Sequence, residues 1–316
     1  MDDLLSRYTA SLSCFDKAIT YAEVLKEPYS FLSSLLDLFG LSSIADIKIF
    51  VEKLEYCRCA HIVNVFLSGT ILFSELYRNR MPEKGEACEG LLNEWNVLSL
   101  AHDIGYIYET FDFAQTHKSI NAVCQEFKVR NFFPQRSCEY LLSSETYARY
   151  FRYKRKAFGL CDHGIIGALL FNHRYDQPGV IQSKADLSWI IAAHSIFISK
   201  PESDSLYRSY GLQELMPGAK EYARLPYRFT RYGLTYILLC LIDITEPINA
   251  FRCACGEDAL VFLRRLSYTV HGNCLSIRSS APCDIDFICA RIHDIDVWMK
   301  TNLVRKSMME LVIEIL

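Results

Sequence analysis

The chain contains 316 residues with a formal net charge of −3, and 51% of its residues are hydrophobic. This length and this hydrophobic content predict one large folded domain or two modest ones, and they argue against a disordered chain. A charge this close to neutral gives no general attraction to nucleic acid or to an anionic membrane, so we expect neither as a partner.

Thirteen cysteines are present, and most of them stand inside apolar segments such as Leu-Leu-Cys240-Leu-Ile, where a thiol acts as a small apolar side chain. The N-terminal Met-Asp-Asp-Leu-Leu-Ser-Arg has acids where a signal peptide would have bases. No uninterrupted apolar stretch is long enough to span a bilayer, and the nearest, 234–242, runs into Asp243. We therefore expect a cytoplasmic protein with reduced cysteines.

Residues 1–50 predict helices, because apolar side chains follow helical spacing and the second apolar stripe stops at Gly40, a natural helix end. We expect these helices to pack on the core or to form the face of a homodimer. The next predicted helix runs from about residue 44 to 77, with a break expected near Gly69. It carries His61, which is read either as a hydrogen-bonded core residue or as a metal ligand.

The stretch Leu98-Ser-Leu-Ala-His102-Asp103-Ile-Gly-Tyr106 lies on a helix predicted over residues 91–109. It places a histidine beside an aspartate in an apolar run, and a buried charge without a partner is unfavourable. A divalent metal is the simplest partner, because it fixes the carboxylate charge and uses the neutral imidazole. Neighbouring helix positions diverge by about 100°, so both side chains reach one site only if it lies close to the helix.

Residues 111–160 are rich in aromatic side chains and end in a basic cluster: Arg149, Arg152, Lys154, Arg155 and Lys156. Such a cluster is usually a solvated face. The alternative is a cationic lip that gathers phosphates at the mouth of a site.

Three more segments carry polar side chains on apolar helices. Asp162-His163-Gly begins one helix, where Asp162 is suited to be the N-cap or to orient an imidazole. A helix over residues 185–194 ends at His194. The last core helix ends in Asp243, which is either a metal ligand or a buried helix-end carboxylate with hydrogen bonds.

Residues 253–316 contain both helical and alternating patterns, whereas the three preceding segments are predicted to be helical. They predict a small α+β lobe with two or three strands. Alternating segments at residues 266–270 and 274–278 flank a turn signal and predict a hairpin. Residues 257–266 and 284–299 look helical, and residues 309–316 predict a closing strand.

The ordered set of polar residues resembles the signature of the HD superfamily of metal-dependent phosphohydrolases over roughly Glu52 to Phe251: His61, His102, Asp103, His163, His194 and Asp243. The variant with two histidines between the doublet and the last aspartate is the two-metal one. The resemblance implies a mainly α protein with an HD-domain helical bundle over residues 51–252. The N-terminal helical segment, 1–50, and the C-terminal lobe, 253–316, flank this bundle.

The resemblance also implies two divalent metal ions such as iron, manganese or zinc. The first site consists of His61, His102, Asp103 and Asp243, and the second of Asp103, His163 and His194, with Asp103 as the bridge. His102 and Asp103 are then the catalytic pair. The implied activity is that of a phosphohydrolase or phosphodiesterase, in which metal-bound hydroxide hydrolyses a small-molecule phosphoester, for example a nucleotide or cyclic nucleotide.

We expect Tyr106, Arg152, Lys154 and Arg174 to contact the substrate. Many HD phosphohydrolases have a lysine where Tyr106 stands, and a tyrosine offers a neutral hydrogen bond but no positive charge. This departure keeps open a nucleotide-binding sensor or scaffold that retains the HD site. The same ordered ligands also resemble the mixed-valent diiron oxygenases of the superfamily.

Overall fold

The computed structural model describes residues 21–43, 50–80, 85–133, 142–176, 184–196, 205–212, 231–246, 265–271, 274–299, 302–307 and 310–314. In these ranges helices predominate and four strands form one small sheet, which confirms the predicted mainly α class with a C-terminal α+β lobe. The helices predicted before residue 21 and over residues 257–264 lie outside the described ranges. No helix in those ranges combines the length and the apolarity that a membrane span requires.

The chain folds into two compact units, and each is described by itself. The first unit consists of Met1–Ser42, Leu54–Leu100 and Ile237–Leu316, and the second of Ser43–Lys53 and Ala101–Tyr236. The boundaries between these two units differ from those between the predicted domains, which are residues 1–50, 51–252 and 253–316.

The first unit is built around α5, α6 and α13, and α5 runs without interruption through Gly69. A Cβ atom on Gly69 would lie 2.0 Å from the Trp95 ring of α6 and 3.0 Å from Ile242 of α13. The expected helix break at Gly69 is therefore wrong, because the glycine serves close helix packing. The helices that belong wholly or mostly to this unit are α2 (Tyr21–Lys26), α3 (Pro28–Leu38), η1 (Leu41–Ser43), α5 (Tyr56–Arg80), α6 (Gly85–Ala101), α13 (Arg231–Thr245) and α16 (Pro282–Met299).

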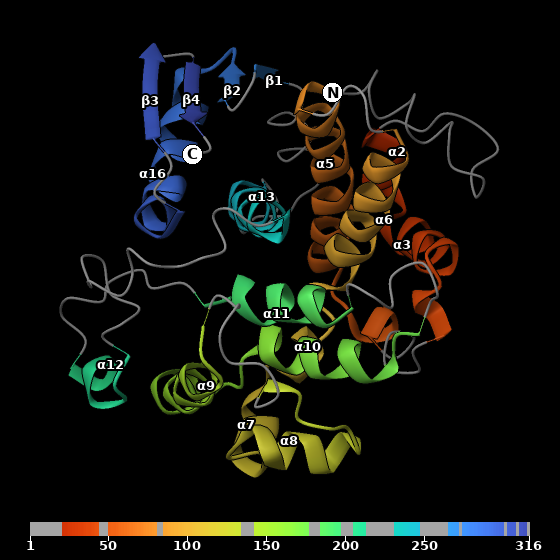
Figure 1. The fold of residues 1–316 in the computed structure, drawn as a ribbon, viewed down its shortest axis with the longest axis vertical. Coiled ribbons are helices and arrows are strands. Elements are labelled where there is room, and N and C mark those ends of the chain that lie inside the picture. Colours follow the sequence, from red (N-terminus) through yellow and green to blue (C-terminus); the bar gives the residue numbers. More distant parts are fainter. Residues whose placement is uncertain are drawn as a thin grey trace. The chain divides into compact units, whose positions relative to one another are not determined.

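The C-terminal part of the first unit is an antiparallel sheet in the order β1-β2-β4-β3, with α16 packed on β2 and β4 (Figure 1). The predicted hairpin is confirmed, and β4 lies within the predicted closing strand. β3 was not predicted, so the described sheet has four strands where two or three were expected. The strands are β1 (Leu266–His271), β2 (Cys274–Ser279), β3 (Asn302–Ser307) and β4 (Glu310–Glu314).

The second unit is helical where it is described, and α10 and α11 run side by side in its core (Figure 1). Residues 164–171 of α10 and 187–194 of α11 are all buried. A Cβ atom on Gly164 would lie 2.5 Å from Ser195 Oγ and 2.7 Å from the Ile191 carbonyl oxygen, so only glycine allows this approach. Its elements are η2 (Tyr106–Tyr108), α7 (Phe111–Thr116), α8 (Ile120–Phe127), α9 (Ser144–Phe158), α10 (His163–Arg174), α11 (Lys184–His194) and α12 (Ser205–Ser209).

Side-chain caps define where the helices of the second unit begin. Ser119 accepts a hydrogen bond from Ala122 N at the start of α8, and Asp162 accepts one from Ile165 N at the start of α10. The prediction of Asp162 as an N-cap is therefore confirmed. This cap fixes His163 as the first residue of α10.

Candidate metal centre

The His102-Asp103 doublet lies in a turn directly after α6, which ends at Ala101. The prediction of one helix over residues 91–109 is wrong at this point. Hydrogen bonds between residues three apart, from Ile104 N to Ala101 O (3.1 Å) and from Tyr106 N to Asp103 O (2.8 Å), close this tight turn. The doublet therefore stands in a tight turn and not in the α-helix that the sequence predicted.

Gly105 allows the doublet turn to approach α10 closely. A Cβ atom on Gly105 would lie 2.0 Å from the carbonyl oxygen of His163 and 2.6 Å from Gly167 N. The backbone of the doublet turn therefore rests directly on the first turn of α10. This contact brings Asp103 next to His163, which is 60 positions further along the chain.

Asp103 is the centre of a buried cluster in the second unit. Its Oδ1 atom lies 3.3 Å from His163 Nε2 and 3.8 Å from His194 Nε2, and its Oδ2 atom lies 3.7 Å from His102 Nε2. Ligand atoms of His102, Asp103 and His194 all lie within 4.8 Å of one another, so this group could hold a metal ion. All three of these residues are buried.

The hydrogen bonds of two imidazoles set the tautomers of this cluster. His163 Nδ1 lies 2.6 Å from a carboxylate oxygen of Glu109, and His194 Nδ1 lies 2.6 Å from the Ile191 carbonyl oxygen. Because both partners are acceptors, both Nδ1 atoms carry the proton in neutral imidazoles, and the Nε2 atoms hold lone pairs. These Nε2 atoms lie 3.2 Å apart. These lone pairs would be available to a bound cation, and this oxygen and nitrogen donor set would suit a first-row divalent metal.

Lys154 connects the carboxylates that support the cluster. Its Nζ lies 2.5 Å from Glu109 and 3.2 Å from Asp162, and Asp162 also accepts a hydrogen bond of 2.8 Å from the Ser195 hydroxyl. Burial raises the pKa of Glu109, but His163 and Lys154 lower it more strongly, to about 2. Burial lowers the pKa of Lys154, whereas the carboxylates of Asp162 and Glu109 raise it above its usual range. Lys154, predicted as a substrate contact, lies in this ion-pair network.

The first unit contains a second set of side chains of the same kind, in which His61 is buried and Asp243 is partly exposed. His61 Nε2 lies 3.0 Å from Asp243 Oδ1, and His61 Nδ1 lies 2.7 Å from Glu246 Oε2. Asn64 donates a hydrogen bond of 2.6 Å to the other oxygen of Glu246. Burial lowers the pKa of His61, but the carboxylates of Asp243 and Glu246 raise it by more, so that the pKa is about 9. This set pairs an imidazole and a carboxylate that are 182 positions apart in the chain.

Sequence reasoning missed two carboxylates, Glu109 and Glu246, each of which holds the Nδ1 atom of a predicted ligand. Glu246 had a usable signal, because it follows Asp243 by three positions and α13 continues to Thr245. Residues three apart share a helix face. Glu109 had no such signal, because it follows the doublet in an irregular segment.

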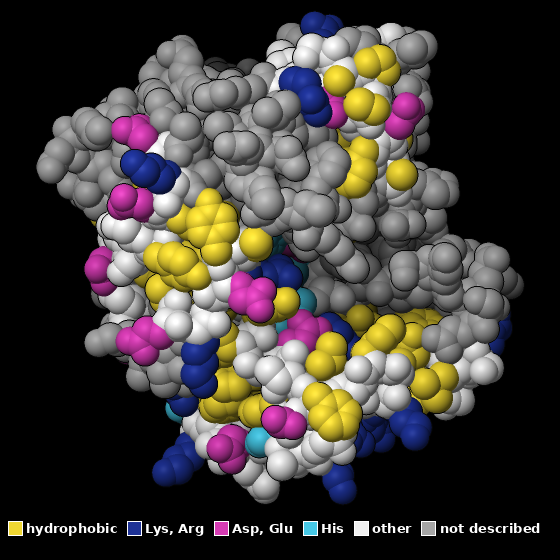
Figure 2. Space-filling view, turned by 180° about the vertical axis from the view of Figure 1, so that it is seen from behind, with side chains coloured by type: hydrophobic (Ala, Val, Ile, Leu, Met, Phe, Trp, Pro, Cys, Tyr) yellow, Lys and Arg dark blue, Asp and Glu magenta, His cyan; other side chains and the backbone are white. Residues whose placement is uncertain are grey.

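The other predicted substrate contacts lie in different surroundings. The Tyr106 ring lies 5.9 Å from the His163 ring, measured between centroids. Arg152 is exposed and donates to the Ala148 carbonyl oxygen, and Arg174 donates to that of Phe127. On the face drawn in Figure 2, the described cationic and anionic side chains are interspersed, in keeping with the net charge of −3.

Comparison with known proteins gave no relative: no protein-family model, no curated protein and no solved structure matches this chain. The resemblance to the HD superfamily therefore depends on the six ordered residues. The structure adds that histidine and aspartate side chains which could hold metal ions lie in both units, and all of them except the partly exposed Asp243 are buried. They are His61 and Asp243 in the first unit and His102, Asp103 and His194 in the second.

Proposed function

We propose that this protein is a metal-dependent phosphohydrolase of the HD type that acts on a small phosphoester, for which a nucleotide or cyclic nucleotide is our first candidate. The observation that carries the proposal is the meeting of Asp103 with the Nε2 atoms of His163 and His194. The Nδ1 atoms of both imidazoles are already occupied by acceptors. Preset tautomers around a carboxylate are typical of metal-binding histidines.

We further propose that the six residues predicted from the sequence bind two divalent metal ions, with Asp103 shared between them. In support, each unit pairs an imidazole with a carboxylate at short range, His61 with Asp243 in one and His163 with Asp103 in the other. Two such ions, when bound, lower the pKa of a coordinated water and neutralise the charge that develops on a phosphoryl group.

The side chains of the chain itself have three tasks in this proposal. Asp103 holds the shared carboxylate at a fixed position, because Gly105 anchors its turn on α10. Glu109 orients His163 and leaves its Nε2 atom as the ligand. Tyr106 donates a neutral hydrogen bond to a phosphoryl oxygen in this proposal, and the 5.9 Å between the centroids of its ring and the His163 ring supports this role.

One observation favours a second candidate, a nucleotide sensor that binds without turnover. Tyr106 has no charge, and the Lys154 ammonium is already shared between two carboxylates. The binding of a phosphate then depends on the metals with little help from these two side chains. Such a protein would bind nucleotides tightly and release no product with any divalent metal.

The test combines metal analysis of the purified protein with a screen of linear and cyclic nucleotides under several divalent metals. We expect about two metals per chain, phosphoester hydrolysis, and loss of both activity and metal in Asp103→Asn. Asp112→Asn is the matched control, because Asp112 is an exposed residue of α7. Tight binding without hydrolysis would support the sensor. Oxygen uptake with an organic substrate after anaerobic iron loading, without phosphate release, would support the oxygenase alternative.

A further inference from the structure

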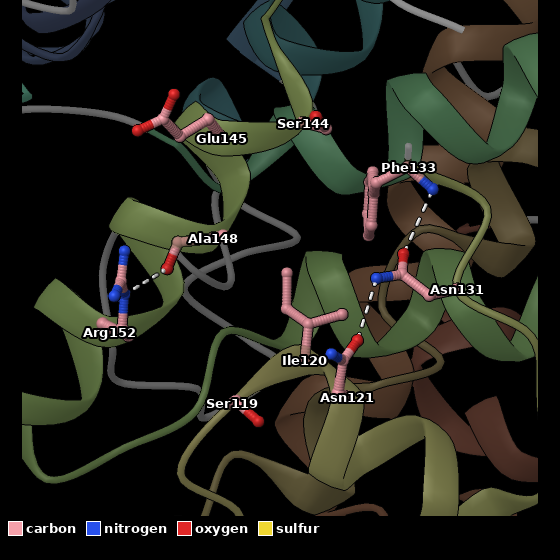
Figure 3. Close-up of a pocket in the computed structure, with 9 residues that line it drawn as sticks. All are labelled: Ser119, Ile120, Asn121, Asn131, Phe133, Ser144, Glu145, Ala148 and Arg152. Atoms are coloured by element: carbon pink, nitrogen blue, oxygen red, sulfur yellow. Dashed lines mark hydrogen bonds between the residues drawn. The ribbon is translucent and has the colours of Figure 1, made fainter. Parts of the chain in front are cut away.

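The second unit contains a pocket of about 360 Å³ at the starts of α8 and α9. Figure 3 shows α9 with Ala148 and Arg152 on one side, and Ile120, Asn131 and Phe133 on the other. None of the six predicted metal ligands lines it, so it is separate from the candidate metal centre. The full set of lining residues is Ser119, Ile120, Asn121, Asn131, Phe133, Ser144, Glu145, Ala148 and Arg152.

Hydrogen bonds inside the wall fix which polar atoms remain for a ligand. Asn131 Oδ1 accepts from Phe133 N at 3.1 Å, and Asn121 Oδ1 accepts from Asn131 Nδ2 at 3.2 Å. Each carboxamide oxygen therefore already accepts one hydrogen bond, and the amide N–H groups are the donors that this pair offers to a ligand. Ser119 Oγ likewise accepts from Ala122 N at 3.2 Å, which leaves its hydroxyl hydrogen as a donor.

The charges of the pocket favour an anion. Arg152 uses Nε for the Ala148 carbonyl oxygen, at 3.2 Å, and its terminal nitrogens carry four further N–H donors. Glu145 is the acid that lines the pocket, and its carboxylate is solvated and lies 3.5 Å from Arg149 Nε, which offsets its charge. The wall thus offers many donors and few acceptors, and Ile120, Phe133 and Ala148 add an apolar surface.

We propose that this pocket is a second binding site, which takes a small anionic ligand through acceptor oxygens of a phosphoryl or carboxylate group. The volume suits a molecule the size of a nucleoside monophosphate. Arg152 pairs with the anionic group, the amide nitrogens of Asn121 and Asn131 donate to it, and the apolar residues contact the rest of the ligand. Arg152 was predicted to bind the substrate of the metal centre, and the pocket gives it a different ligand site. This inference does not depend on the proposed function.

The test is isothermal titration of the full-length protein with AMP, adenosine, inorganic phosphate and citrate. We expect AMP to bind and adenosine to bind at least tenfold more weakly, because adenosine has no anionic group. A comparison of phosphate with citrate shows which acceptor group the site prefers. Arg152→Gln and Asn121→Asp are each expected to weaken AMP binding by about tenfold or more, since both replace a donor at the anion.

Two controls separate this pocket from the metal centre. Lys156→Gln removes a cation one helical turn further along α9, where the side chain is exposed, and it should change AMP affinity less than twofold. Asp103→Asn and chelator-treated wild-type protein should both retain AMP binding. Binding that disappears without metal and is unaffected by Arg152→Gln would overturn the proposal, as would the absence of binding by every probe.

Discussion

Glu109 joins His163 to Lys154 through the two oxygens of one carboxylate. Oε2 lies 2.6 Å from His163 Nδ1, and Oε1 lies 2.5 Å from Lys154 Nζ. The Glu109 carboxylate therefore holds the orientation of the His163 imidazole, and the Lys154 ammonium holds the position of that carboxylate. In metal sites, partners of this kind orient the ligand histidine and increase its basicity.

We predict that Glu109→Gln lowers the affinity for metal by about 10- to 100-fold, the usual effect of losing a carboxylate behind a ligand histidine. Glutamine keeps the size of the side chain but removes the charge that stabilises the polarised imidazole. Titration of metal against a competing chelator measures the effect. Glu126→Gln is the control, because that carboxylate is 61% exposed. Equal affinity in Glu109→Gln and wild type would show that Glu109 has only a structural role.

We predict that Lys154→Met destabilises the protein by about 3–5 kcal/mol, because it leaves Asp162 and Glu109 without their buried cation. The Asp162 side chain is 0% exposed, so water does not replace the ammonium. Denaturant unfolding measures the loss, and Lys156→Met on the exposed side of α9 should change stability by less than about 0.5 kcal/mol. The double variant Lys154→Met/Glu109→Gln should lose less than the sum of the single losses, and strict additivity would contradict the ion-pair interpretation.

We predict that Gly105→Ala is far more damaging than Gly167→Ala. The added Cβ atom meets the His163 carbonyl oxygen at 2.0 Å in the first variant and Gly105 N at 3.1 Å in the second. Real Cβ atoms essentially never approach another atom as closely as 2.0 Å, so the backbone must shift, and we expect Gly105→Ala to lose about 1–3 kcal/mol or more and to lose metal. The denaturant midpoints and the metal contents of the two variants show whether Gly105→Ala is the more damaging one. Similar losses in both would mean that the doublet turn is free to shift away from α10.

The metal-ligand candidates could be predicted from the sequence because each stands out chemically. His61 and Asp243 interrupt apolar runs, and the doublet places two ionisable groups side by side among buried residues. Their order along the chain then supplied the resemblance. The helix ending in His194 and the hairpin of β1 and β2 were also predicted, the first because it is an apolar segment of helical length and the second because two alternating segments flank a turn signal.

What the sequence did not predict depends on contacts between distant segments. α6 ends before the doublet, whose turn meets the backbone of α10 at Gly105, and nothing within residues 91–109 signals that neighbour. Gly69 was read as a helix break, although it makes room for the Trp95 ring. β3 has only Leu303 and Val304 as adjacent apolar residues, which is too short a pattern for an alternating strand.

The set in the first unit gives a prediction of its own. Glu246→Gln removes the charge that holds His61 Nδ1, so we expect weaker binding of one of the two proposed metals while the other is retained. The metal content should fall from about two to about one per chain at limiting metal concentration. Elemental analysis measures this content, with the exposed Glu55→Gln as the control. A simultaneous loss of both metals would show that the two sites do not bind independently.

The last prediction concerns removal of the metal. The Nε2 atoms of His163 and His194 lie 3.2 Å apart beside the Asp103 carboxylate, and both His194 and Asp103 are buried. A metal that binds the folded state alone stabilises it by about 2.7 kcal/mol at a concentration of 100 times Kd. Chelation should therefore lower the denaturant midpoint of the wild type, and restored metal should raise it again. Asp103→Asn should be insensitive to both treatments, because the amide loses the negative charge that joins the histidines in the donor set. A wild-type midpoint that does not respond to chelator or to added metal would mean that these histidines are held by hydrogen bonds alone.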